Sequence, residues 1–192
     1  MDTPSITHSV PQAVLTKLGD VLASYALVEQ SLKHLVGALV SADDHIGAVV
    51  TAEVPTKVLP MMARSLYKVH FGEDDQLSDL LALMKRVDSA EQERNQIAHS
   101  HWDGFGSPLL DEAELPADSV VRLKIRARDG LEWRRQPLSA SDLNMMARRM
   151  DDLARDLLEF WRLNVNRARR RFAQHIAETV PANEIVPRST KR

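Results

Sequence analysis

Apolar residues recur at intervals of three and four along most of this 192-residue chain, and this spacing constrains the fold more than any other feature of the sequence. An α-helix turns by about 100° per residue, so residues at such intervals share one face, which must be buried against another element. Four such stripes lie within residues 14–39, 59–69, 77–87 and 143–161. The sequence therefore predicts a mostly α-helical protein, an up-and-down helical bundle.

Capping residues and prolines indicate where these helices begin and end. Ser9 followed by Pro11 predicts the start of the first helix, Ser41 is expected to cap the second, and Gly72 is expected to end the third. We place the helices at about 10–40, 42–52, 56–71 and 74–99, with a last one that starts at Ser139 or Ser141.

One stretch alternates with a period of two instead, which is typical of a β-strand. Between 121 and 128, apolar residues alternate with Arg122, Lys124, Arg126 and Arg128. The pair Asp129-Gly130 is a strong hairpin-turn signal, and a return strand is expected to end at Pro137. The sequence thus predicts a small β-hairpin at about 119–137, with one basic face, inserted before the last long helix. The stretch 100–119 is expected to be irregular.

Composition limits the class of protein. With 44% hydrophobic residues we expect one domain over 10–178, after an N-terminal extension (1–9) and before a flexible basic tail (179–192). The chain has no cysteine, which excludes disulfides, thiol catalysis and cysteine-ligated zinc. No targeting leader or run of roughly 20 apolar residues is evident, so we expect a cytoplasmic protein that does not enter a membrane. The net charge of −2 does not by itself point to nucleic acid.

The apolar stripe of the fourth helix turns polar towards its end. On the same helical projection, Glu91 falls at the centre of the stripe, and Arg94 and Asn95 lie on its flanks. A buried ion costs several kcal/mol unless it is paired, so this helix end needs either an internal partner or a polar cleft. Glu29 similarly interrupts the stripe of the first helix, which makes it a candidate buried partner for Arg94.

The segment Arg94-Asn95-Gln96-Ile97-Ala98-His99, with Trp102 shortly after it, closes a long helix and precedes a basic hairpin and a final helix. This arrangement resembles the HEPN (higher eukaryotes and prokaryotes nucleotide-binding) domains, in particular bacterial members with an Arg-Asn-x-Ile-Ala-His motif. Glu29 matches an acidic position that these members often keep on their first helix. The resemblance covers about residues 10–165.

The resemblance implies metal-independent RNA cleavage, as in many family members, or non-catalytic binding or regulation, as in others. It assigns catalytic roles to Arg94, Asn95 and His99, with Glu29, Glu91 and Trp102 in support. It also implies a homodimer in which two motifs face one cleft, no cofactor or metal, and a toxin–antitoxin or phage-defence setting with an antitoxin or nucleotidyltransferase partner. The basic strand residues are the expected RNA contacts, because they could follow a phosphate backbone: Arg122, Lys124, Arg126 and Arg128.

The chemistry of these side chains is consistent with that expectation. When the 2′-hydroxyl of RNA attacks its own phosphate, a group that moves protons near neutral pH and a cation on the developing charge are needed. His99 and Arg94 are such groups. Asn95 and His99 share a helix face, but Arg94 lies about 140° from His99 on an ideal helix. The long arginine side chain or a loosened last turn has to bring the two together.

Structural interpretations stand beside the functional ones. Arg94 could pair with Glu29 or Glu91 to tie two helices together, and His99 could bind the last carbonyls of its helix. Trp102 could stack on a base or anchor the following segment, and the basic strand face could be solvated surface. The alternative functions are therefore a non-catalytic module that binds a nucleotide, RNA or a protein, and a purely structural bundle. A groove that presents arginine and histidine together would favour the ribonuclease.

Overall fold

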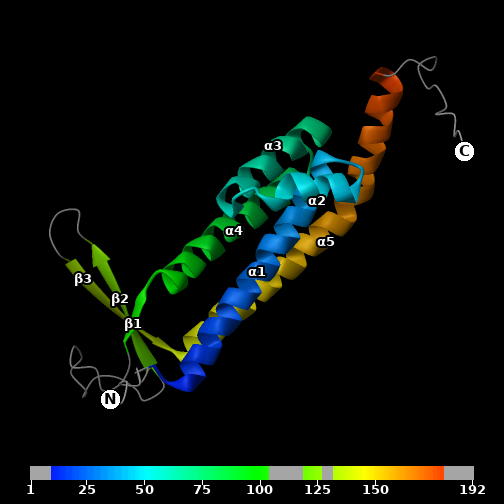
Figure 1. Cartoon of the computed structure of the whole chain (residues 1–192). Coiled ribbons are helices and arrows are strands. Elements are labelled where there is room, and N and C mark those ends of the chain that lie inside the picture. Colours follow the sequence, from blue (N-terminus) through cyan, green and yellow to red (C-terminus); the bar gives the residue numbers. More distant parts are fainter. Residues whose placement is uncertain (1–9, 104–118, 127–131, 180–192) are drawn as a thin grey trace, which may run out of the picture. The chain divides into compact units, whose positions relative to one another are not determined.

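The computed structural model describes residues 10–103, 119–126 and 132–179 (Figure 1). It is mostly helical, and a small antiparallel sheet precedes the last long helix, which confirms the predicted fold class. The elements are α1 (Gln12–Val40), α2 (Asp44–Ala52), the 3₁₀ turn η1 (Thr56–Val58), α3 (Leu59–Phe71), α4 (Leu77–Ala98), β1 (His101–Asp103), β2 (Ser119–Arg126), β3 (Glu132–Ser139) and α5 (Ala140–Thr179).

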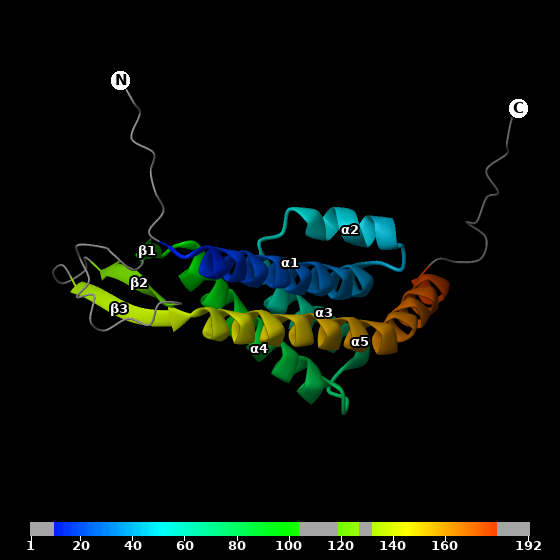
Figure 2. The same ribbon diagram turned by 90° about the horizontal axis from the view of Figure 1, so that it is seen from below.

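The chain divides into two compact units. The first comprises Met1–Val28 and Arg86–Ala154, and the second comprises Glu29–Lys85 and Arg155–Arg192. The helices α1, α4 and α5, which are labelled in Figure 2, each contribute residues to both units.

The first unit contains the sheet, whose strand order is β1-β2-β3. Strand β2 pairs antiparallel with β3 from Ser119↔Ser139 to Arg126↔Glu132, as expected for a hairpin. The expectation of irregular chain directly after residue 100 is wrong, because His101–Asp103 pairs with β2 on its other edge, with Trp102 opposite Arg122. Three residues are too few to show the alternation with a period of two by which a strand is predicted from sequence.

The predicted turn Asp129-Gly130 lies outside the described residues, as do the segments 1–9 and 180–192.

The end of β3 also differs from the expectation. Pro137 lies within the strand, opposite Val121, instead of ending it. Because β3 is an edge strand, a residue without a backbone N–H is tolerated there. Ser139 then caps α5: its hydroxyl accepts from the N–H of Asp142 (3.1 Å), and the Asp142 carboxylate accepts from the N–H of Ser139 (2.9 Å). The bond from the Ser139 N–H, together with one that the Ser139 hydroxyl donates to the same carboxylate (2.7 Å), holds the pKa of Asp142 below its usual range.

Helix α2 shows how local chemistry and packing set the details of the second unit. It begins at Asp44, later than expected, because Asp43 is the cap: its carboxylate accepts from the N–H groups of His45 and Ile46. Its buried residues are Gly47 and Thr51. Its larger apolar side chains are exposed: Ile46, Val49 and Val50. Leu22 on α1, Val69 on α3 and Leu81 on α4 are likewise exposed members of expected apolar stripes.

A polar network in the second unit joins α3, the segment before α4 and α5. The guanidinium of Arg167 donates to the Asp74 carboxylate (2.6 Å) and to Gln76 (2.7 Å), and its Cζ lies 4.5 Å from the Phe71 ring centroid. The Tyr67 hydroxyl donates to Asp74 (2.8 Å). Burial and this bond raise the pKa of Tyr67 to about 12, while Arg167 holds the pKa of Asp74 below its usual range. The network fixes the entry into α4.

Candidate functional site

The end of α4 presents the predicted motif within the first unit. Ile97 is buried and anchors this end, whereas Glu91, Arg94 and Asn95 are half-buried and His99 is exposed. The helix is anchored by apolar contacts on one side while its last two turns offer polar side chains to solvent. Arg94 is therefore not the fully buried cation that the helical projection suggested, because only part of its side chain is covered.

Two neighbours orient the Arg94 guanidinium. Its Nη1 donates a hydrogen bond of 3.0 Å to the Asn95 side-chain oxygen. Its Cζ lies 5.7 Å from the ring centroid of Tyr25, a buried residue of α1, which is within the range of a cation–π interaction. The sequence places Tyr25 in the apolar stripe of the first helix but gives no signal of this contact. Arg94 is thus held by an adjacent amide and an aromatic face, and among the described residues only one of its N–H donors makes a hydrogen bond.

His99 lies just beyond the end of α4. The helix ends at Ala98, and the backbone N–H of His99 still donates to the carbonyl of Asn95 (3.1 Å) in the turn that follows. Within the part of the chain that the structure describes, the His99 ring makes no hydrogen bond, neither to Arg94 nor to the last carbonyls of the helix. The imidazole is exposed and therefore accessible to a substrate.

The three supporting residues behave differently from one another. Glu29 is half-buried rather than buried, and it pairs with Lys33 one turn along α1 (3.0 Å). Its pairing with Arg94 stays a prediction. Glu91 is half-buried on α4. The indole N–H of Trp102 donates to the carbonyl of Ile97 (3.1 Å), so its ring edge is turned back to the helix end, which is an anchoring arrangement.

One of the four basic residues predicted for RNA binding reaches the motif. Arg122 of β2 donates to the side-chain oxygen of Gln96 (2.6 Å), the third residue of the motif, and also to that of Gln136 on β3. Burial lowers the pKa of the Arg122 guanidinium. Lys124 and Arg126 lie further along β2, with backbone partners on β3, and their side chains lie outside the described part, as does all of Arg128. No pattern in the sequence indicates that Gln96 links the helix to the sheet.

The described residues contain no group of three or more histidine, aspartate or glutamate side chains that could hold a metal ion. Among these residues, no single helix has the length and apolar character to cross a membrane, and only the bent pair Asp44–Ala52 and Thr56–Phe71 meets both criteria jointly. The side-chain groups near the motif that could take part in a reaction are thus an exposed imidazole, an oriented guanidinium and a carboxamide.

Comparisons with protein-family models, curated proteins and solved structures found no match to this chain.

Proposed function

We propose that this chain is a HEPN-like, metal-independent endoribonuclease whose catalytic residues are Arg94, Asn95 and His99. The observation that carries the proposal is that the exposed His99 imidazole follows directly after a helix end at which Asn95 and Tyr25 orient Arg94. A general base has to be accessible to its substrate, and a cation that stabilises a developing charge has to be oriented before the reaction begins.

In the proposed reaction, His99 accepts the proton of an RNA 2′-hydroxyl while that oxygen attacks the adjacent phosphorus. The guanidinium of Arg94 stabilises the extra negative charge on the phosphoryl oxygens. The bond from phosphorus to the 5′-oxygen breaks, and this oxygen leaves with a proton from a second acid. The products are a 2′,3′-cyclic phosphate and a free 5′-hydroxyl. A second His99, from the other subunit of a homodimer, is the proposed source of that proton.

The test compares His99→Ala with wild type on single-stranded RNA in the presence of EDTA. We expect wild type to cut and to leave 2′,3′-cyclic phosphate ends, and His99→Ala to lose at least about 100-fold in rate, the usual contribution of a general acid or base. Thermal stability should hardly change, because His99 is exposed. His45→Ala is the matched control, since His45 is an exposed histidine on α2. A folded His99→Ala protein that cuts as fast as wild type contradicts the proposal.

The alternative function is a non-catalytic module that binds a nucleotide, RNA or a protein partner. It is favoured by one observation: the guanidinium of Arg94 is engaged by Asn95 and Tyr25, and no hydrogen bond joins it to His99 among the described residues. In that case Arg94→Ala weakens binding, and no RNA is cut by wild type under any condition. Cleavage that EDTA leaves intact and His99→Ala abolishes excludes this alternative.

A further inference from the structure

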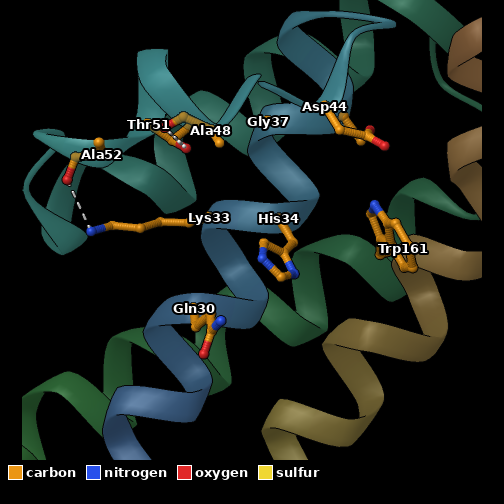
Figure 3. A pocket seen from close by; sticks show the side chains of 10 residues that line it. Gln30, Lys33, His34, Gly37, Asp44, Ala48, Thr51, Ala52 and Trp161 are labelled. Carbon is orange, nitrogen blue, oxygen red and sulfur yellow. Dashed lines mark hydrogen bonds between the residues drawn. The ribbon is translucent and has the colours of Figure 1, made fainter. Parts of the chain in front are cut away.

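The second unit contains a pocket that shares no residue with the proposed catalytic motif. Its volume is about 360 Å³, close to the lower end of the roughly 300–1,000 Å³ that small-molecule sites occupy. Helices α1, α2 and α5 line it, as the close-up in Figure 3 shows. The residues that matter for its chemistry are Gln30, Lys33, His34, Asp44, Ala48 and Trp161.

The hollow arises from small residues where α1 and α2 cross. A Cβ atom added to Gly47 would come within 2.6 Å of the carbonyl oxygen of Gly37, so the two backbones touch at this point. Next to the crossing, both helices carry alanines whose methyl groups are too short to fill the space between them, among them Ala38 and Ala48. The pocket is therefore built into the crossing of the two helices.

Two aromatic rings border this space from different helices. Figure 3 shows the His34 imidazole on α1 and the Trp161 indole on α5 facing the pocket. His34 is exposed and Trp161 is half-buried. Within the described ranges neither ring makes a hydrogen bond or a contact with another ring, so their faces and their ring nitrogens are free to contact a ligand. Aromatic faces favour flat, aromatic partners.

The charged groups around the pocket are already neutralised in pairs. The ammonium of Lys33 lies 3.0 Å from the Glu29 carboxylate and donates to the carbonyl of Ala52 at 3.1 Å, the bond that is dashed in Figure 3. The Asp44 carboxylate accepts from Arg169 with both oxygens, at 2.9 and 2.7 Å. An ionised ligand group would have to break one of these pairs, so the pocket favours an uncharged ligand.

We propose that this pocket binds a neutral, planar heteroaromatic molecule of one or two fused rings. The ring inserts beside His34 and Trp161, and its polar edge exchanges hydrogen bonds with the His34 ring nitrogens and the Gln30 carboxamide, which also lines the pocket. The site is separate from the proposed ribonuclease motif and does not depend on it.

The test is a titration of the ¹⁵N-labelled full chain, followed by the indole N–H signal of Trp161, which Trp161→Phe assigns. Nicotinamide and adenine are the neutral planar probes. Nicotinate has the same ring as nicotinamide but carries a charge, and cyclohexanecarboxamide is neutral but not planar. We expect saturable shifts with a Kd in about the millimolar range for the two neutral planar probes, and at least about tenfold weaker binding of the other two.

Two variants locate the binding. Ala48→Leu places a larger side chain at an exposed position that lines the pocket and should abolish the shifts, whereas Val49→Leu changes an exposed neighbour that does not line the pocket and should leave them unchanged. Trp161→Ala, followed through the His34 ring signals, should weaken binding by on the order of tenfold, as expected for the loss of one stacking face. The proposal is overturned if neither neutral probe saturates up to about 10 mM, if nicotinate binds better than nicotinamide, or if folded Ala48→Leu binds as wild type does.

Discussion

At the scale of single residues, the role of Arg94 depends on what holds its guanidinium. The Asn95 oxygen takes one donor, at 3.0 Å, and the Tyr25 ring lies under the charge, at 5.7 Å. Neither partner is an anion, so among the residues that the structure describes nothing cancels the charge of Arg94. A guanidinium that is oriented but not neutralised is better suited to hold a phosphate than one that is fixed in an ion pair. Arg167, by contrast, is neutralised by Asp74 at 2.6 Å.

The pair formed by Asp74 and Arg167 predicts how stability depends on pH. Arg167 holds the pKa of Asp74 in the folded chain below its ordinary value of 3.8. The stabilisation is therefore complete above pH 3.8 and is lost as the pH falls through the lower, folded-state pKa. We expect Asp74→Asn to lower the free energy of unfolding at neutral pH and to flatten its decline below about pH 4.

Urea unfolding measured from neutral pH to about pH 2 checks this prediction. Asp75→Asn is the matched control, because Asp75 is the exposed neighbour and forms no ion pair within the described ranges. If Asp74→Asn and Asp75→Asn give the same pH profile, the pair with Arg167 does not contribute to acid stability.

At the scale of elements, the crossing of α1 and α2 depends on two glycines. A Cβ on Gly47 would lie 2.6 Å from the Gly37 carbonyl oxygen, which is backbone and can move only if a helix shifts. We expect Gly47→Ala to destabilise the protein by about 1–3 kcal/mol, as overpacking does. Gly19→Ala is the control: no atom lies within 4 Å of its added Cβ, so helix propensity should stabilise that variant by about 0.5–1 kcal/mol. Thermal unfolding of both variants measures these changes in stability. Equal changes for Gly47→Ala and Gly19→Ala would contradict the close contact between the two helix backbones.

The basic face of β2 is tested through the salt dependence of RNA binding. Arg122, Lys124 and Arg126 alternate with apolar residues in the sequence of β2, which is the pattern that predicts a basic strand face. If Lys124 and Arg126 contact phosphates, replacing both by alanine should flatten the slope of log affinity against log salt by about 1.4, at about 0.7 per contact for single strands. The matched control is Arg170→Ala/Arg171→Ala, since both arginines are exposed on α5. An unchanged slope for the strand pair, or an equal change for the control pair, identifies this face as ordinary charged surface.

The sequence predicted those helices and strands whose own residues show a regular spacing of apolar side chains. Helical spacing located all the long helices, and alternation located β2 and its partner. It missed β1 because three residues carry no periodicity, and it placed the end of β3 at Pro137 because the edge position of the strand cannot be read locally. The bond from Arg94 to its sequence neighbour Asn95 lies within the predicted motif. The contacts of Arg94 with Tyr25 and of Gln96 with Arg122 join segments that are far apart in the chain. The spacing of residues in one sequence does not show which distant segments pack together.

At the scale of the whole molecule, the proposed reaction needs an acid as well as a base. One chain offers one His99, so the proposal includes a two-fold homodimer that brings two motifs into one cleft. Light scattering coupled to size exclusion should give twice the chain mass of 21.6 kDa at tens of micromolar. If the wild type has the mass of a single chain, the shared cleft is excluded. If Arg122→Ala still has the mass of a dimer, the contact between Arg122 and Gln96 is not needed for assembly.

Mixing wild type with an inactive variant tests whether subunits share the site. If the His99 of one subunit acts as the base and the His99 of the other as the acid, a mixed dimer of wild type and His99→Ala lacks one of the two groups and is inactive. Random exchange of equal amounts leaves about a quarter of the dimers fully wild type, so activity should fall to about a quarter of that of the same total amount of wild type. Wild type mixed with His45→Ala is the control and should keep full activity. If the activity falls only to about a half, each chain cuts with its own His99 alone, and the shared cleft is excluded.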